Sequence, residues 1–274
     1  MTAPTCVEFL KWALAFLGLS WPGFRRVHRQ VCRRVGHRVQ ELRLPDLAVY
    51  RQYLENHPEE WVILDSFCRI PISRLLRDRD VFERLGSEVL PCLAAAALRR
   101  GARELRCWSA GCASGEEPYS LGILWARELS ARYPDLSLRI VATDIDEHLL
   151  ERASLGRYSK SSLREVPTSW LTTAFVRGAG WYEVRPEYRE GIEFVAQDIR
   201  QALPSGWFDL ILCRNLVFTY FDPELQIRTA SRALSVLRPG GALVIGLKEA
   251  LPEGIEGLEP WVPELRIYRK SGGS

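Results

Sequence analysis

The stretch that decides the fold runs from Trp108 to Ser120 and reads Trp-Ser-Ala-Gly-Cys-Ala-Ser-Gly-Glu-Glu-Pro-Tyr-Ser. Residues 105–108 before it predict a buried strand. Residues 118–131 predict a helix, with Pro118 at an early position where its missing N–H costs little. The loop between them consists of small residues, which let the backbone approach a ligand closely. A strand, such a loop and a helix N-terminus together form a nucleotide-type site in open α/β sheets.

This loop differs from two common phosphate-binding loops. It contains Gly111 and Gly115 but no third glycine, and no Gly-Lys-Ser/Thr follows. It is therefore neither the dinucleotide fingerprint nor the P-loop. Two carboxylates, Glu116 and Glu117, stand where a phosphate would meet the helix, so we expect a ligand with hydroxyl groups or a positive centre. Taken alone, the loop also fits a tight turn whose surface acids cap a helix.

From Gly101 onward, strand and helix patterns alternate, which predicts a parallel sheet covered by helices. Residues 156–191 interrupt the alternation and predict an insertion, with a helical piece at 161–175 and a hairpin at 181–188. The expected strands are 105–108, 139–143, 192–196, 208–213, 242–246 and 265–268. The expected helices are 81–99, 118–131, 147–155, 200–203 and 223–237.

The first 68 residues predict a small helical domain, and the arginine-dense residues 69–80 predict a connector. The expected helices are 5–20, 24–42, 47–55 (capped by Asp46) and 59–68. In the second of these, valines every four residues form an apolar stripe. Its other faces hold Arg25, Arg26, Arg29, Arg33, Arg34 and Arg38. This pattern fits a solvated face, a docking surface for an acidic protein, or one for nucleic acid or anionic lipid.

The composition is that of a soluble globular protein of one large domain, or of one domain with a small companion. Residues 1–50 contain eight Lys/Arg against three Asp/Glu, whereas the whole chain has a net charge of only +3. Seven cysteines include no CxxC pair, and the four histidines show no ligand spacing, so we expect reduced thiols and no metal site. We find no signal peptide and no apolar run of about 20 residues, and expect a cytoplasmic protein without membrane insertion.

Polar residues follow two of the expected strands at the ligand edge of the sheet. Asp144 directly follows the strand 139–143, a position from which a carboxylate can accept both ribose hydroxyls. Asp146 is better suited to cap the next helix. Arg214 and Asn215 end the strand 208–213. The segment Leu237-Arg-Pro-Gly-Gly241 resembles the helix-to-strand connection of doubly wound S-adenosylmethionine-dependent methyltransferases.

Together with Ala142-Thr-Asp-Ile-Asp146, Phe208-Asp-Leu-Ile-Leu-Cys-Arg-Asn215 and Tyr220-Phe-Asp222, the opening stretch resembles the CheR family. These are protein-glutamate O-methyltransferases that esterify chemoreceptor side chains. The resemblance implies an α/β fold: a doubly wound, mostly parallel, Rossmann-like class I methyltransferase sheet with a small N-terminal all-α domain and a small inserted hairpin subdomain. The implied domains are 1–80, the helical domain and connector, and 81–274, the methyltransferase domain with its insertion at about 156–191.

The resemblance also implies the site residues. Those implied to bind S-adenosyl-L-methionine are Pro71, Ser73, Arg77, Gly111, Glu117, Asp144, Asp198, Ile199, Asn215 and Leu216. Arg77 and Tyr220 are implied to lie near the transferred methyl; otherwise, Arg77 would form a connector salt bridge and Tyr220 would be a packing aromatic. Pro71 and Leu75-Leu76 stand where the family has Asn and Phe-Phe, and the segment before Tyr220 is one residue longer than usual.

The leading hypothesis is therefore a methyltransferase for protein glutamates, whose basic helix 24–42 faces an acidic, receptor-like helix. Two alternatives stay open: a methyltransferase for another carboxylate or a small molecule, and a non-catalytic module that binds the cofactor or a partner. A nucleic-acid methyltransferase is disfavoured, because the catalytic half is not basic and no Asn/Asp-Pro-Pro-Tyr follows the fourth strand. The sequence names neither the methyl acceptor nor the oligomeric state.

Overall fold

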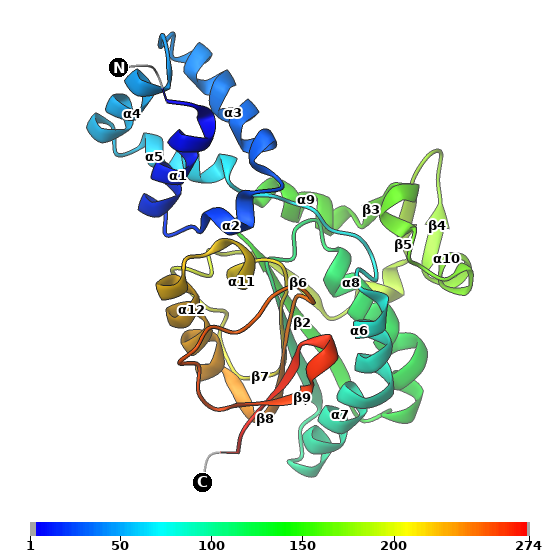
Figure 1. The fold of residues 1–274 in the computed structure, drawn as a ribbon. Coiled ribbons are helices and arrows are strands. Elements are labelled where there is room, and N and C mark those ends of the chain that lie inside the picture. Colours follow the sequence, from blue (N-terminus) through cyan, green and yellow to red (C-terminus); the bar gives the residue numbers. More distant parts are fainter. Residues whose placement is uncertain (1–3, 273–274) are drawn as a thin grey trace. The chain divides into compact units, whose positions relative to one another are not determined.

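The computed structural model describes residues 4–272 and divides into two compact bodies (Figure 1). The first extends to Pro71 and includes Thr219–Gln226; the second comprises Ile72–Phe218 and the chain from Ile227 onward. Most of the predicted connector, from Ile72, therefore belongs to the second body. Within residues 4–272, none of the helices combines the length and apolar character needed to cross a membrane.

The first body is helical, as predicted. Its helices are α1 (Cys6–Phe16), α2 (Trp21–Phe24), α3 (His28–Glu41), α4 (Leu47–Asn56) and α5 (Glu60–Phe67). The Asp46 carboxylate caps α4 by accepting from the N–H groups of Ala48 and Val49, at 2.8 and 3.0 Å. The expected helix 5–20 stops at Phe16, because Gly18 adopts a φ of +66°, which ends a helix.

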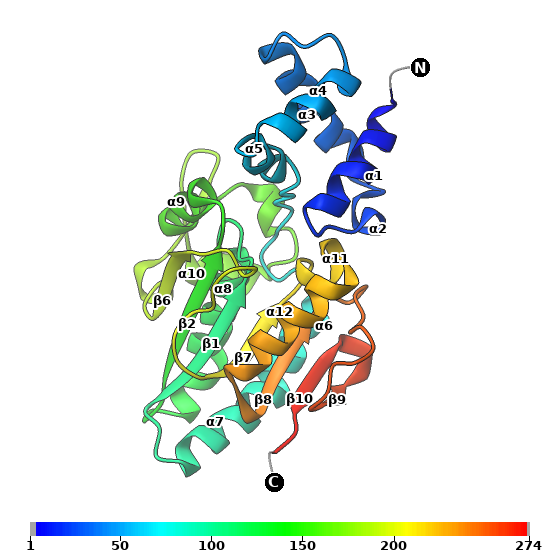
Figure 2. The same cartoon turned by 90° about the vertical axis from the view of Figure 1, so that its left-hand side faces the viewer.

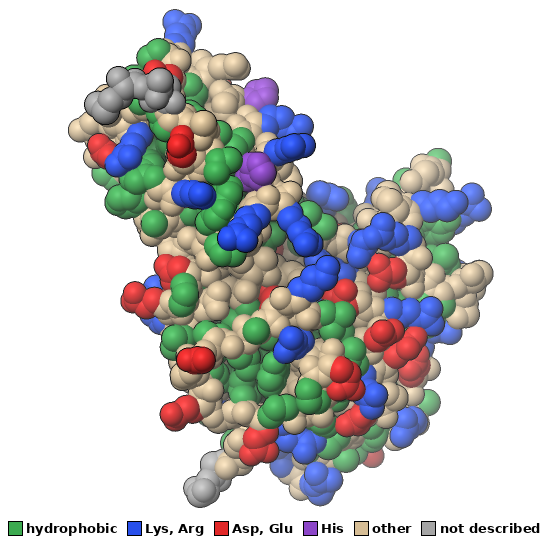
Figure 3. Space-filling view, in the orientation of Figure 1, with side chains coloured by type: hydrophobic (Ala, Val, Ile, Leu, Met, Phe, Trp, Pro, Cys, Tyr) green, Lys and Arg blue, Asp and Glu red, His purple; other side chains and the backbone are tan. Residues whose placement is uncertain are grey.

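The predicted basic helix 24–42 begins later than expected: residues 25–27 form a turn after α2, and the helix itself is α3, from His28 to Glu41. Two of the predicted arginines serve the fold. Arg38 forms a two-pronged ion pair with the buried Glu60, both contacts at 2.9 Å. Arg34 donates to the carbonyls of Phe67 and Arg69, at 2.7 and 2.9 Å. The valine stripe is buried, as predicted. The arginines that remain exposed are Arg25, Arg26, Arg29 and Arg33, and Figure 3 shows Lys, Arg and His side chains gathered over this part of the body.

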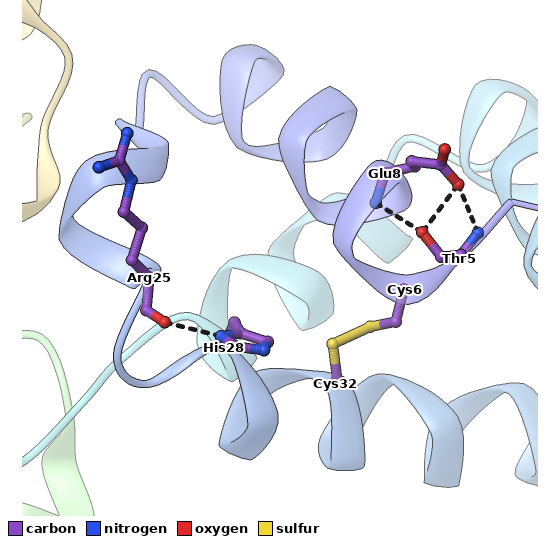
Figure 4. The surroundings of a disulfide bond; sticks show 6 residues. All are labelled: Thr5, Cys6, Glu8, Arg25, His28 and Cys32. Carbon is purple, nitrogen blue, oxygen red and sulfur yellow. Dashed lines mark hydrogen bonds between the residues drawn. A yellow bond between two sulfur atoms is a disulfide. The ribbon is translucent and has the colours of Figure 1, made fainter.

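A disulfide joins α1 to α3, which corrects the expectation that all thiols are reduced. Cys6 and Cys32 have Cα atoms 6.0 Å apart and a bond between their sulfur atoms. Figure 4 shows the bridge beside the capping box of Thr5 and Glu8, which begins α1. The pairing depends on how the two helices cross, which the spacing of cysteines in the sequence does not reveal. The other five cysteines form no disulfide.

We predict that reduction destabilises the helical body. The disulfide closes a loop with a sequence separation of 26 residues, for which the chain-entropy model gives about 3.5 kcal/mol. Chemical denaturation of the wild type should show a lower midpoint with a reducing agent, and the Cys6→Ser/Cys32→Ser variant should be insensitive to that agent. Cys92→Ser, which removes an exposed free thiol, is the control. An unchanged wild-type midpoint on reduction would contradict the prediction.

The second body is built on a seven-stranded sheet in the order β6-β2-β1-β7-β8-β10-β9. The strands are β1 (Glu104–Ala110), β2 (Ser137–Asp144), β6 (Ile192–Ala196), β7 (Phe208–Cys213), β8 (Leu237–Ile245), β9 (Leu258–Val262) and β10 (Ile267–Lys270). The first five in sheet order are parallel, and β10 is antiparallel to both its neighbours. The predicted mostly parallel, doubly wound α/β sheet is confirmed.

Helices cover both faces of this sheet (Figures 1 and 2). On one face, Leu210 and Leu212 of β7 join a core with side chains of the helices before and after β1. These helices are α6 (Arg79–Arg84), the π-helical η1 (Leu85–Val89), α7 (Leu90–Arg99), α8 (Glu116–Leu124) and the π-helical η2 (Trp125–Leu129). The helix α9 (Glu147–Leu155) follows β2 and packs its Leu150 against Cys112 and Ala142. Figure 1 shows α12 (Pro223–Ser235) on the opposite face. The short helix α11 (Val217–Tyr220) follows β7.

The predicted insertion contains a separate small sheet in the order β3-β5-β4. Its elements are β3 (Arg157–Tyr158), η4 (Lys160–Leu163), α10 (Thr168–Ala174), β4 (Phe175–Arg177), β5 (Tyr182–Val184) and η5 (Pro186–Tyr188). The hairpin is therefore formed by β4 and β5, earlier in the chain than the expected 181–188.

Three expectations in the second body are wrong. Residues 200–203 form only a turn, because Pro204 follows them and the turn is closed by the Asp198 carboxylate. Residues 237–241, which were expected to connect a helix to the strand 242–246, already belong to β8. The pairing of β8 with β7 is irregular in register there. The edge strand β9 was not expected, since Pro260 interrupts its pattern, although proline is tolerated at a sheet edge.

Candidate functional site

The carboxyl ends of the parallel strands lie at one edge of the sheet, because Ala110 pairs with Thr143, Asp144 with Ala196, and Cys213 with Ile245. The residues that follow these ends therefore come together. They include Gly111, Glu117, Asp144, Asn215 and Leu216, five of the residues predicted to bind the cofactor. This edge is the candidate site.

The small-residue loop after β1 wraps around the end of β2. The N–H groups of Gly111 and Cys112 both donate to the Thr143 carbonyl, at 2.8 and 3.0 Å. Gly111 has a φ of +73°, and a Cβ added there would lie 2.6 Å from Cδ2 of Leu216. Glycine suits this position because it adopts a positive φ without strain and has no Cβ to meet Leu216. The loop can therefore approach the segment after β7 closely.

Asp144 organises the turn after β2. Its Oδ2 accepts from the Ala113 N–H at 2.8 Å, and its Oδ1 accepts from the Asp146 N–H at 3.0 Å. Burial raises the pKa of this carboxyl, and these hydrogen bonds oppose the rise. Asp146 caps α9 through the N–H groups of His148 and Leu149, as predicted. Each oxygen of Asp144 keeps a further lone pair for a ligand hydroxyl.

Glu117 and Glu116 are neighbours in different surroundings. Glu117 accepts from the Ser109 hydroxyl at 2.7 Å and pairs with Arg214 at 3.1 Å. Glu116 is 4% exposed and accepts from the hydroxyl of Ser114. Burial raises the pKa of Glu116, and a hydrogen bond from Ser73 is among the influences that lower it. Ser73, predicted to bind the cofactor, thus lies against Glu116.

The segment after β7 is fixed by Glu249. This buried carboxylate accepts from the N–H groups of Asn215 and Gly246, at 2.9 and 2.5 Å, and so joins the ends of β7 and β8. A Cβ at Gly246 would lie 2.5 Å from the Asn215 side-chain nitrogen. The Asn215 amide therefore rests over Gly246, and Asn215 itself has a φ of +57°.

The remaining predicted residues belong to three segments: Asp198 and Ile199 follow β6, Arg77 is in the connector, and Pro71 and Tyr220 are in the first body. The Asp198 carboxylate binds Arg200, with an ion pair at 2.9 Å, and Ile199 beside it is buried. The Arg77 guanidinium donates to the Ile72 carbonyl at 2.7 Å. Pro71 and Tyr220 belong to the helical body, where Tyr220 packs on Phe24 with ring centroids 5.1 Å apart. As cofactor or reaction residues, these five and the residues at the sheet edge all stay predictions.

The sequence of the second body identifies its family. Residues 72–262 match the model of the CheR methyltransferase, SAM-binding domain. The chain belongs to the CheR methyltransferase family. The sequence-based recognition is thereby confirmed, as is the identification of a methyltransferase that uses S-adenosylmethionine.

Two of the relatives reported for this CheR-family chain are named chemotaxis protein methyltransferases, and a third is named only as an uncharacterized protein. A chemotaxis protein methyltransferase of Listeria monocytogenes is 35% identical over 205 residues, which is 74% of this chain and 75% of that protein. One of Escherichia coli K12 is 31% identical over 257 residues, 85% and 86% of the two chains. A 104.1 kDa protein of Rhodobacter capsulatus is 36% identical over 228 residues, but the chain spans only 23% of its length.

Sequence reasoning missed four residues of this CheR-family site: Ser109, Asp78, Arg214 and Glu249. Arg214 and Ser109 did stand in the quoted motifs, each as a polar residue at the end of a buried strand. That position is a signal which could have found them. Asp78 was one charge among many in the connector, and Glu249 lies outside every motif, so its position gave no such signal.

Proposed function

We propose that this CheR-family chain transfers the methyl group of S-adenosylmethionine to glutamate side chains of a chemoreceptor-like protein and forms methyl esters. The observation that carries the proposal is the match of residues 72–262 to the family domain. The gathering of Glu117, Asp144 and Asn215 at one sheet edge supports it, because these are the positions that the resemblance assigns to the cofactor.

The side chains at this edge fit S-adenosylmethionine in their chemistry. Asp144 would accept the ribose hydroxyls, and Glu117 would bind the positively charged amino group of the methionine part. Asn215 and Leu216 would lie by the adenosine. Asp198 and Ile199 would border the adenine, and Pro71, Ser73 and Arg77 would close the site from the connector. S-adenosylmethionine supplies a methyl group activated by a positively charged sulfur.

The protein residues have a limited chemical task. A glutamate side chain has an ordinary pKa of about 4.3 and is ionised at neutral pH, so no general base is required. The residues must instead exclude water from the acceptor carboxylate and align its oxygen with the methyl group. We assign Arg77 a positioning role, because tight binding of the acceptor carboxylate would slow its attack. Tyr220 would orient the methyl group.

We also propose that an acidic receptor-like helix docks on the exposed arginines Arg25, Arg26, Arg29 and Arg33. The positive charge of this region and the negative charge of the glutamate acceptor support this assignment. No role in nucleic-acid binding is proposed. We also propose that the protein acts in the cytoplasm.

Charge reversal on this surface is expected to weaken binding of the methyl acceptor and to leave cofactor binding unchanged. In the Arg29→Glu/Arg33→Glu variant, the KM for a receptor fragment should rise about tenfold at low salt, since two attractive contacts become repulsive. The affinity for S-adenosylhomocysteine should stay within twofold of wild type. Reversal of the exposed Arg103 in the second body (81% exposed side chain) is the control. An unchanged acceptor KM would count against the docking surface.

The function itself is tested by methyl transfer. The full chain, methyl-labelled S-adenosylmethionine and a receptor cytoplasmic fragment should yield label that mild alkali releases as methanol, with mass spectrometry placing it on glutamates. Label that resists alkali, or that appears only on small-molecule carboxylates in a parallel panel, would point to another acceptor. Binding of cofactor without transfer to any acceptor would favour a non-catalytic module.

A further inference from the structure

The side chain of Arg214 is buried between the connector and the small-residue loop. The family resemblance assigned no role to this residue. It follows the last residue of β7, and its side chain is 3% exposed. One terminal nitrogen donates to Oδ2 of Asp78 at 2.7 Å and to the Arg77 carbonyl at 2.8 Å. The other donates to Oε2 of Glu117 at 3.1 Å. The guanidinium also lies 5.5 Å from the ring centroid of Phe82.

The connector adopts a conformation that needs such an anchor. Leu76 and Asp78 have φ values of +53° and +60°, in the left-handed region that residues other than glycine avoid. Other segments of the second body hold the connector in this conformation, among them Ser162, whose carbonyl accepts from the Leu75 N–H at 3.0 Å. The Leu76 N–H donates to the Ser120 hydroxyl of α8 at 2.8 Å, and Arg214 binds the Arg77 carbonyl and the Asp78 side chain. Arg77 lies between these two strained residues.

We propose that Arg214 is a positioning residue of the cofactor site, an inference that rests on the proposed function. Its planar guanidinium fixes the main chain of Arg77 and the carboxylate of Glu117 at the same time. It acts through these two residues: both of its terminal nitrogens donate to protein acceptors, and its buried Nε has no protein partner. Without it, the carboxylates of Asp78 and Glu117 would lose the cation that they share, and the Arg77 carbonyl would lose its side-chain donor.

The test compares Arg214→Lys with the same change in another arginine that binds a carboxylate of the second body. Arg100, which follows α7, donates at 2.7 Å to Asp209 near the start of β7; here the carboxylate is the buried partner, 4% exposed, and Arg100 is 32% exposed. Both lysine variants keep the charge and lose the planar guanidinium. Calorimetry on the full chain measures the Kd for S-adenosylhomocysteine, thermal melts measure Tm, and kinetics separate the two KM values.

For Arg214→Lys we expect the Kd for S-adenosylhomocysteine and the KM for S-adenosylmethionine to rise at least tenfold, with the acceptor KM within twofold. For Arg100→Lys we expect a lower Tm but a Kd within twofold of wild type. The inference is overturned if Arg214→Lys binds like wild type, or if both variants lose affinity equally. If Arg214→Lys does not fold, Asp78→Asn decides: a Kd raised at least threefold supports the inference, and an unchanged Kd overturns it.

Failure of the inference and failure of the proposed function give different results. A wild type that binds S-adenosylhomocysteine while Arg214→Lys binds equally well contradicts the inference alone. A wild type that binds no S-adenosylhomocysteine contradicts both.

Discussion

Asp144→Asn is expected to raise the Kd for S-adenosylhomocysteine about 100-fold. The carboxylate would accept two ribose hydroxyls, and hydrogen bonds to a charged group contribute about 1.5–3 kcal/mol each, while each 1.4 kcal/mol changes affinity tenfold. Asparagine keeps the shape but loses the charge. Its amide group would also face one of the two N–H donors, Ala113 or Asp146, that the carboxylate oxygens now satisfy. Calorimetry on the full chain measures the effect.

Asp146→Asn is the matched control for this variant. Asp146 lies two residues further along the same turn and caps α9, a role that asparagine fills about as well. Its Kd should stay within twofold of wild type. Equal losses in the two variants would contradict the assignment of Asp144 to the ribose and would indicate instead a general disturbance of the turn.

The pH dependence of binding gives a second readout of Asp144. Burial raises the pKa of this carboxyl in the folded protein. Because the folded state binds this proton more tightly than the unfolded state, the ionised carboxylate lowers the free energy of unfolding. That loss is recovered as the pH falls through the raised pKa of the folded state. Ribose binding needs the ionised form, so affinity should fall on acidification at a higher pH than for an ordinary aspartate. In Asp144→Asn this acid limb should be absent; its persistence would assign it to another group such as Glu116.

Glu117→Gln is expected to raise the same Kd about 30-fold. The variant removes the negative charge that would meet the amino group of the methionine part, a loss of about 2 kcal/mol. It also leaves Arg214 paired with Asp78 alone. In steady-state kinetics the KM for S-adenosylmethionine should rise, whereas the KM for the receptor fragment should change little.

The adjacent Glu116→Gln provides the control. Glu116 precedes Glu117 directly in the sequence and is more deeply buried than Glu117. Burial raises the pKa of Glu116, so its surroundings accept a neutral amide better than those of Glu117 do. We expect a Kd within threefold of wild type. A larger loss in Glu116→Gln than in Glu117→Gln would reverse the roles of the two carboxylates.

The sequence was sufficient to predict the fold where local signals decide it. The caps at Asp46 and Asp146, the valine stripe of α3 and the five parallel strands were all predicted, because each depends on residues close together in the chain. The edge strand β9 escaped because its proline removes the strand pattern. The disulfide of Cys6 and Cys32 escaped because it depends on a helix crossing.

The candidate site shows the same division. Gly111, Asp144 and Asn215 stand at strand ends, where a one-dimensional pattern already places residues at the ligand edge. Arg214 has its partners 97 and 136 residues away in the sequence, in Glu117 and Asp78. No local pattern records such a contact. For the same reason, Arg38 was assigned to a solvated or docking face although it binds the buried Glu60.

A crystal structure of the full chain with S-adenosylhomocysteine tests the central claim most directly. The account predicts the nucleoside at the carboxyl edge of β1, β2 and β7, with both ribose hydroxyls within hydrogen-bonding distance of the Asp144 carboxylate and the amino group against Glu117. A ligand bound away from this edge, or a ribose that Asp144 does not contact, would contradict it.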